Sequence, residues 1–252
     1  MNRTALNAAI QAANFTTINS WDVSLIKDMT DLFKDMHTFN ENISAWNTSS
    51  VTTMNGMFQN AIAFNQSLNA WNTSSVQSMN GMFHNATAFN GNISAWNTSS
   101  VNNMQAMFHS ASHFNQNIVK WDVSNVEFAS YMFAFATNFN QNIDAWNVTN
   151  MQATELMFVY ACKLQWPLCS WGNNGPFENC TVISEKQPLL CTAVPSVSPT
   201  APSVSPTAPS VTPTPAPTSA PRPPFEMQTL LLVATGTSVC VAIAGLASTV
   251  IG

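Results

Sequence analysis

Tryptophan recurs every 25 residues over the first two thirds of this 252-residue chain, and no insertion or deletion interrupts the interval. Two phenylalanine columns keep the same interval, one starting at Phe33 and the other at Phe39. A fixed period of this length predicts a solenoid, because one such unit cannot bury its apolar face alone and must stack on its neighbours. The tryptophan column comprises Trp21, Trp46, Trp71, Trp96, Trp121, Trp146 and Trp171.

One half of each unit has the pattern of a short strand. Ile43, Trp46 and Thr48 have the spacing L-x-x-L-x-L, which matches the strand segment of a leucine-rich repeat with other residues in place of the leucines. Side chains alternate across a strand, so Trp46 and Thr48 are expected to point inward while Asn47 and Ser49 point outward.

The other half of each unit favours turns. From Val51 to Phe64 the apolar residues recur mostly at steps of three, which favours short helical or 3₁₀ turns on the opposite side of the coil. An asparagine directly follows each second-column phenylalanine, and we interpret this column as a ladder that satisfies backbone groups at a tight corner. The ladder comprises Asn40, Asn65, Asn90, Asn115 and Asn140.

The column pattern W-D/N-V/T-S-x-V-x-x-M-x-x-M-F-x-x-A-x-x-F-N-x-x-I resembles the BspA-like leucine-rich repeat family, found on the surfaces of bacteria and some eukaryotic microbes. The match covers about residues 18–171. The resemblance implies a right-handed solenoid, surface display, and adhesion or ligand binding, and it carries no catalytic residues. The sequence departs from the pattern in the charged segment 27–35 and at Phe128 and Ala129.

The outward positions of the predicted strands form a small, flat, polar strip. Such a surface is where solenoids bind their partners, although a merely solvated face has the same composition. We therefore take the strip as the candidate binding face for an extracellular protein or glycan. It comprises Asp22, Ser24, Asn47, Ser49, Asn72, Ser74, Asn97, Ser99, Asp122, Ser124, Asn147 and Thr149.

Charge and motifs exclude several function classes. Only 8% of the residues are charged and the net charge is −5, so no basic stripe exists to bind nucleic acid. Catalytic and nucleotide-binding motifs are missing, and residues 42–116 contain no Asp or Glu for acid–base chemistry. His84 and His109 share a column, but no carboxylate accompanies them, so we expect no metal site. We expect neither enzymatic activity nor a cofactor.

Cysteines appear only where the repeat decays. Residues 1–160 contain none, and four then cluster within 30 residues. An even number at the end of a solenoid predicts two disulfides, whose three alternative pairings the sequence does not separate. Their spacing lacks the close pairs that a zinc site needs. The four are Cys162, Cys169, Cys180 and Cys191.

The expected domains divide the chain into five parts. Residues 1–17 form a capping segment with the spacing of an amphipathic helix at about 4–13, and the solenoid occupies 18–172. A cysteine-containing cap follows at 173–193. No signal peptide is visible at the start, which favours a fragment or a mis-assigned start because the rest of the chain indicates secretion. The last two parts are 194–226 and 227–252.

Composition changes completely after the cysteines. Residues 194–226 repeat the phrase PSVSPTA and then degenerate, which predicts a disordered, polyproline-like stalk with Ser and Thr as O-glycan sites. Residues 227–252 are apolar and uncharged and are long enough to cross a bilayer. Both a transmembrane helix and a cleaved lipid-anchor signal remain open. Either one places the solenoid outside the cell, at the cell membrane.

These features predict a non-enzymatic cell-surface glycoprotein that presents its solenoid for adhesion or ligand binding. Eleven Asn-x-Ser/Thr sequons supply candidate N-glycan sites. The alternative is a structural wall or coat glycoprotein without a soluble ligand. An ice-binding surface is a distant third hypothesis, because Thr48, Thr73 and Thr98 are expected to point inward.

Overall fold

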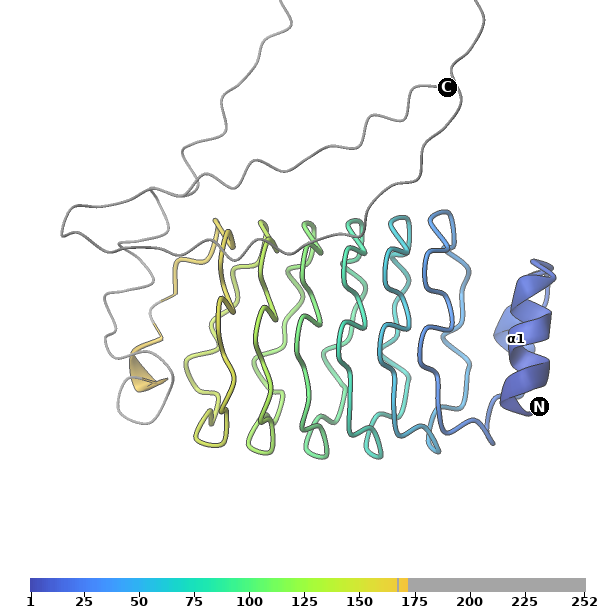
Figure 1. The fold of residues 1–252 in the computed structure, drawn as a ribbon, viewed down its shortest axis with the longest axis horizontal. Coiled ribbons are helices and arrows are strands. Elements are labelled where there is room, and N and C mark those ends of the chain that lie inside the picture. The colour runs from blue at the N-terminus through green and yellow to red at the C-terminus, as the bar shows by residue number, and fades with distance from the viewer. Residues whose placement is uncertain (167, 172–252) are drawn as a thin grey trace, which may run out of the picture. The chain divides into compact units, whose positions relative to one another are not determined.

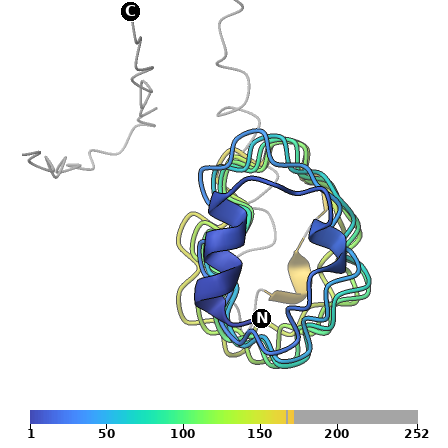
Figure 2. The same cartoon turned by 90° about the vertical axis from the view of Figure 1, so that its right-hand side faces the viewer.

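The computed structural model describes residues 1–166 and 168–171, together with all side chains in these ranges except that of Cys169. Helix α1 (Arg3–Gln11) and the 3₁₀ turn η1 (Ile18–Ser20) come first, and a second 3₁₀ turn, η2 (Cys169–Trp171), comes last. Between them the chain winds into coils of 25 residues that stand side by side, with α1 against the first coil (Figure 1). Seen along the stack, the coils superimpose as closed loops (Figure 2).

The coils pair through their backbones at a place other than the one expected. No strand is assigned to the tryptophan segment in the described residues, and the pairing consists of isolated parallel bridges. The bridges connect equivalent positions of six consecutive coils, so the strand expected around Trp46 and Thr48 is replaced by pairing that begins five residues beyond Thr48. The bridged residues are Asp28, Thr53, Ser78, Asn103, Phe128 and Ala153.

Beyond each bridge, four N–H groups donate to carbonyl oxygens of the following coil. Met54, Gly56, Phe58 and Asn60 donate to residues 78–84 at N···O distances of 2.8–2.9 Å. The same set recurs at all five junctions between paired coils, always with the donor in the earlier coil. The peptide groups of this segment are therefore aligned along the stack, with N–H groups toward the later coil and carbonyls toward the earlier one.

Alternating backbone handedness produces this alignment. The second and fourth donors of each coil have positive φ, as at Gly56 (57°) and Asn60 (59°). These positive-φ residues turn successive donors to one side. Hydrogen bonds between residues three apart, such as Gln59 N to Gly56 O at 2.9 Å, make the segment a run of turns to which no 3₁₀ helix is assigned. Non-glycine residues adopt this conformation at a cost of roughly 1–2 kcal/mol each, which the inter-coil hydrogen bonds offset. Asp31, Tyr131 and Leu156 have it without being glycine.

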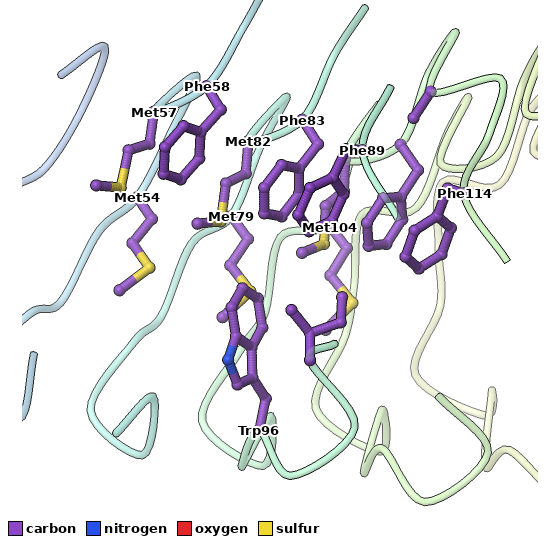
Figure 3. Close-up of a cluster of buried hydrophobic side chains, with 14 of the residues drawn as sticks. Met54, Met57, Phe58, Met79, Met82, Phe83, Phe89, Trp96, Met104 and Phe114 are labelled. Atoms are coloured by element: carbon purple, nitrogen blue, oxygen red, sulfur yellow. The ribbon is translucent and has the colours of Figure 1, made fainter. Parts of the chain in front are cut away.

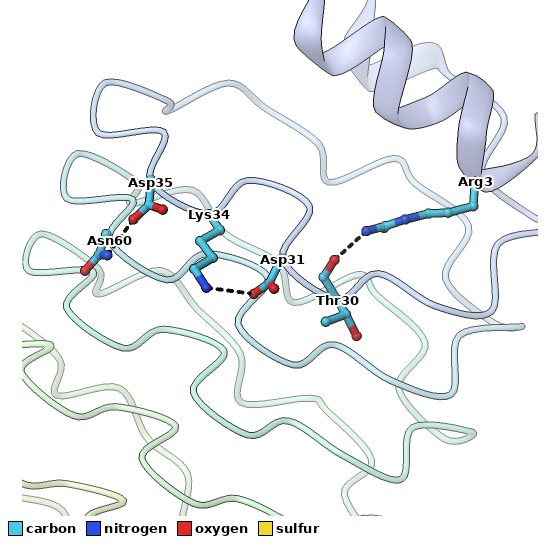
Figure 4. Close-up of polar contacts among 6 residues, drawn as sticks. All are labelled: Arg3, Thr30, Asp31, Lys34, Asp35 and Asn60. Carbon is cyan, nitrogen blue, oxygen red and sulfur yellow. Dashed lines mark hydrogen bonds and ion pairs between the residues drawn. The ribbon is translucent and has the colours of Figure 1, made fainter. Parts of the chain in front are cut away.

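The first coil would expose its carbonyl oxygens, and α1 covers them. The Arg3 guanidinium donates from Nη1 to the Asp28 carbonyl at 3.0 Å, and from Nη2 to the Thr30 carbonyl (Figure 4). The helix itself is capped by Asn2, whose Oδ1 accepts from the Ala5 N–H at 2.9 Å. A positive charge therefore lies where the aligned carbonyls end, as favoured at the C-terminus of a helix.

The core consists of the expected aromatic columns. The tryptophans of the 25-residue column are buried from Trp46 to Trp171, and four of the five neighbouring pairs have ring centroids 6.0–6.5 Å apart. Trp21, the first of the column, is only partly buried. Each indole N–H from Trp46 to Trp146 donates to a carbonyl of the preceding turn of chain, as Trp96 does to Leu68 O at 2.9 Å. Methionine and phenylalanine side chains fill the other side of the same core (Figure 3). The inward orientation of the tryptophans is confirmed.

The asparagine ladder is also confirmed. Asn40 Oδ1 accepts from the backbone N–H of Asn65 at 2.8 Å, and the same bond joins each later pair along the column. Thr48, Thr73 and Thr98 are buried, and each hydroxyl donates to a carbonyl of the following coil at 2.8–2.9 Å. Side chains at both positions thus connect coils that no regular strand joins.

Candidate functional site

The twelve residues of the predicted strip lie at equivalent, at least partly exposed positions of consecutive coils. Each Asn or Asp forms a small turn with the residue two positions later. Asn72 Oδ1, for example, accepts from Ser74 N at 3.1 Å and from Ser74 Oγ at 2.8 Å. Because this turn recurs from coil to coil, the acceptor oxygens are engaged within the chain. The amide nitrogens of Asn47, Asn72 and Asn97 make no hydrogen bond within the described part of the chain.

Two carboxylates interrupt this row of amides. Hydrogen bonds from the Ser24 hydroxyl and backbone lower the pKa of Asp22, and those from Ser124 lower the pKa of Asp122 in the same way. Both side chains are therefore ionised at neutral pH. The strip presents neutral amide donors in its middle coils and a negative charge in the first and fifth coils.

A second surface, which we call the ladder face, lies over the paired segments. It consists of the outward side chains of residues 30–35 and of the equivalent residues at steps of 25. Its chemistry changes along the stack. The first coil is charged, and Lys34 Nζ lies 3.8 Å from Asp31 Oδ1 (Figure 4). The next three coils are uncharged, and the fifth and sixth carry Tyr131, Phe135 and Leu156.

A shallow groove of about 280 Å³ follows the ladder face across the first four coils. Its floor is formed by Gly56, Gly81 and Ala106, which occupy one column. Asp31 closes the column at one end, since a Cβ atom placed on Gly56 would lie 2.3 Å from Asp31 Oδ1. Tyr131 is the next residue of this column beyond Ala106. The groove exists because the middle coils have almost no side chain where the outer coils have large ones.

Aromatic side chains gather beyond the groove. Tyr131 is 37% exposed and Phe135 is 41% exposed. The His109 ring lies 6.3 Å from that of Tyr131 and 5.5 Å from that of Phe135, and Phe135 stacks on Tyr160 at 4.7 Å. This cluster is an exposed apolar surface of the kind that marks binding sites.

His84 lines the groove, and the His109 ring of the next coil lies beside it, with centroids 4.6 Å apart and ring planes tilted by 60°. Burial lowers the pKa of both imidazoles, and the positive charge of Lys34 lowers the pKa of His84 further. Both are therefore neutral at physiological pH. Within residues 1–166 and 168–171, no group of three or more His, Cys, Asp or Glu side chains is placed to hold a metal.

Several sequence predictions fall outside the described residues. Cys162 is disulfide-bonded, while the side chain of Cys169 and the whole of Cys180 and Cys191 are not described, so the pairing stays a prediction. The stalk and the apolar segment 227–252 also lie outside. Among the helices that are described, none has the length and hydrophobicity to cross a bilayer.

Sequence reasoning identified the strip but missed the ladder face. The signal was present as departures from the repeat, because Phe128 was recognised as an exception, whereas Tyr131 and Phe135 were not. Column-by-column comparison places Tyr131 where the middle coils have Gly56, Gly81 and Ala106. Only the paired coils show that this column lies on the outside.

The fold and its surfaces define a repeat protein built of stacked 25-residue coils. Family comparison agrees with the repeat: one model, described as Mycoplasma protein of unknown function, DUF285, matches residues 3–112 and again residues 91–185. The chain belongs to this family. Searches of curated proteins and of solved structures found no significant match.

Proposed function

We propose that the chain is a non-enzymatic cell-surface protein that uses a right-handed, BspA-like leucine-rich-repeat solenoid to bind an extracellular protein or glycan. The resemblance of the repeat columns supports the family relationship. The proposed stalk and membrane segment, with the disulfide at Cys162, support display outside the cell.

One observation carries the binding proposal. The strip repeats the same amide donor in consecutive coils, and each amide is held by a turn to a serine hydroxyl and backbone. Fixed donors lose little conformational entropy when they bind, which increases affinity without further contacts. A regular row also engages an extended partner at several points at once.

The test uses full-length chain expressed on cells that do not otherwise adhere. Adhesion to immobilised matrix proteins and glycans is compared between the wild type and the double variant Asn72→Asp, Asn97→Asp. The exchange retains the acceptor oxygen of the turn, as Asp22 and Asp122 do, but replaces each amide donor by a carboxylate. We expect adhesion to fall while thermal stability stays unchanged.

Leu25→Ser is the matched control, because Leu25 is 75% exposed and lies outside the strip columns. Equal adhesion by wild type, control and double variant would remove the strip from the mechanism. No adhesion by the wild type to any surface in the panel would contradict the function itself.

The alternative is a structural wall or coat component. Such a component would grow by pairing the free backbone groups of one stack with those of the next. Arg3 occupies the Asp28 and Thr30 carbonyls that this growth requires, which favours a stack that ends. The inward threonines likewise disfavour an ice-binding surface.

A further inference from the structure

We propose that the groove of the ladder face, together with the aromatic side chains that lie beyond it in the fifth coil, binds a neutral oligosaccharide. The inference rests on the proposed function and names a ligand class for a surface that the repeat pattern did not single out. Three properties of the groove carry it: an open floor, walls of uncharged hydrogen-bonding groups, and exposed aromatic rings at one end.

The floor lets a ligand approach the backbone at Gly81, whereas the Asp31 carboxylate lies over Gly56. Gly56 and Gly81 have φ of 57° and 61°, values at which glycine is the least strained residue. This backbone conformation does not by itself require glycine, because Asp31 and Tyr131 adopt it at the equivalent positions of other coils. A Cβ atom on Gly81 would have no neighbour closer than 3.8 Å, so the space above it is open.

The walls offer hydrogen bonds without charge. On one side, Asn55 uses its Oδ1 to accept from Ser78 Oγ at 2.6 Å and Asn80 N at 3.0 Å, while its Nδ2 makes no hydrogen bond within the described residues. The side-chain amides of Asn80 and Gln105 make no hydrogen bond within the described part of the chain. Gln59 and the neutral His84 form the other wall. Amides and imidazoles of this kind donate to and accept from hydroxyl groups.

The lack of charged side chains in the middle of the groove disfavours charged ligands. No Asp, Glu, Lys or Arg occurs between Glu41 and Lys120, so coils two to four carry no formal charge. In the first coil, Lys34 and Asp31 offset one another at the closed end. A phosphate, sulfate or carboxylate would lose its hydration in this groove without gaining an opposite charge. A neutral polyhydroxylated chain has no such cost.

The exposed aromatic rings beyond the groove offer an apolar surface to a sugar ring. Tyr131 continues the column of Gly56, Gly81 and Ala106 in the fifth coil, and the rings of Tyr131 and Phe135 lie 6.3 and 5.5 Å from that of His109. A sugar ring has an apolar C–H face and a polar rim, and it needs an aromatic surface next to amide groups. Few charged and many hydrogen-bonding residues around an aromatic anchor are typical of small-ligand sites. The narrow floor suits a single oligosaccharide chain better than a protein surface.

The experiment begins with purified full-length chain on a printed array of neutral and anionic oligosaccharides. Calorimetry then measures the affinity of the wild type and of two Gly81 variants for the neutral oligosaccharide that binds most strongly on the array. Gly81→Tyr places in the middle of the floor the side chain that Tyr131 carries in the fifth coil. Gly81→Ala is the matched control, because it introduces the same backbone strain and leaves the groove open.

We expect neutral oligosaccharides to bind, Gly81→Tyr to weaken binding at least about tenfold, and Gly81→Ala to change it less than about threefold. The double variant Tyr131→Ala, Phe135→Ala is expected to weaken binding by about tenfold or more, since aromatic anchors dominate such sites. Unchanged melting temperatures of the variants separate loss of the groove from loss of folding.

Binding to anionic spots alone, or no binding to any neutral oligosaccharide, overturns the proposal. So does adhesion to a matrix protein that Gly81→Tyr abolishes and neutral oligosaccharides do not compete, because it assigns the groove to a protein. If cells that display the chain adhere but the purified chain binds no oligosaccharide, the proposed ligand of the groove is refuted and the proposed adhesive function still stands. Oligosaccharide binding that Gly81→Tyr abolishes, without cell adhesion, supports the groove and contradicts the adhesive function.

Discussion

Trp96→Ala in the middle of the stack measures how strongly the coils depend on one another. The Trp96 side chain is 4% exposed and is stacked between Trp71 at 6.5 Å and Trp121 at 6.0 Å. Its indole N–H donates to Leu68 O at 2.9 Å. Replacement by alanine therefore removes an aromatic side chain from a packed core and one of the two hydrogen bonds to Leu68 O, which keeps the Trp71 N–H as a donor at 3.0 Å.

The expected cost is roughly 3–5 kcal/mol of unfolding free energy, the range for truncation of a buried tryptophan or phenylalanine. Trp96→Phe retains most of the ring but loses one of the two hydrogen bonds to Leu68 O, so it is expected to cost about 0.5–1.5 kcal/mol. The difference between the two variants separates packing from hydrogen bonding. Because each coil is stabilised by its neighbours, the loss also weakens both junctions of the fourth coil.

The assay is equilibrium unfolding in urea, followed by circular dichroism and by iodide quenching of tryptophan fluorescence. Trp166→Ala is the control, since Trp166 is 44% exposed in the last described turn of chain and is expected to cost less than about 1.5 kcal/mol. A Trp96→Ala cost below about 1 kcal/mol, or repeat tryptophans fully accessible to iodide, would refute the packed aromatic column.

Four further predictions concern other parts of the chain. Arg3→Gln is expected to lower stability by about 1–3 kcal/mol, because it removes a charged donor from two carbonyls, and to promote end-to-end association detectable by light scattering; a monomer of unchanged stability would contradict the capping role. The native pKa values of His84 and His109 are lowered from 6.5, so the unfolded chain binds protons first and stability falls as pH decreases below about 6.5. His84→Gln, which copies Gln59 of the second coil, should flatten that dependence, and an unchanged pH profile would argue against it. Mass spectrometry of non-reduced peptides should find two bonds among the four clustered cysteines, and four free thiols would exclude them. Protease added to intact cells should cut within residues 194–226 and release the repeats, whereas release only after permeabilisation would place them inside the cell.

The 25-residue interval by itself determined which side chains form the core. Trp, Phe and Met are large and apolar, and their columns can be buried only if equivalent residues of successive coils lie on one another. The asparagine ladder follows from its fixed place after a buried phenylalanine column, and the inward threonines were predicted from the alternation of apolar and polar residues around each tryptophan. Neither inference required knowledge of the backbone path.

The backbone path was decided by the tertiary structure. The tryptophan segment has the alternation of a strand, yet the coils pair five residues beyond Thr48, in a segment where residues such as Asn60 and Tyr131 have positive φ. Single-residue preferences do not predict this conformation for tyrosine, because it is stabilised by hydrogen bonds to another coil and not by local geometry.

The ladder face was decided in the same way. Gly81 and Tyr131 are 50 residues apart in the chain and belong to the same column, but the sequence does not reveal whether that column faces the core or the solvent. Pairing of the coils places this column on the outside. The small residues of the middle coils therefore leave a groove, and the large side chain of Tyr131 follows in the fifth coil. A binding surface of this kind depends on side chains from successive coils, and their positions exist only once the coils have stacked.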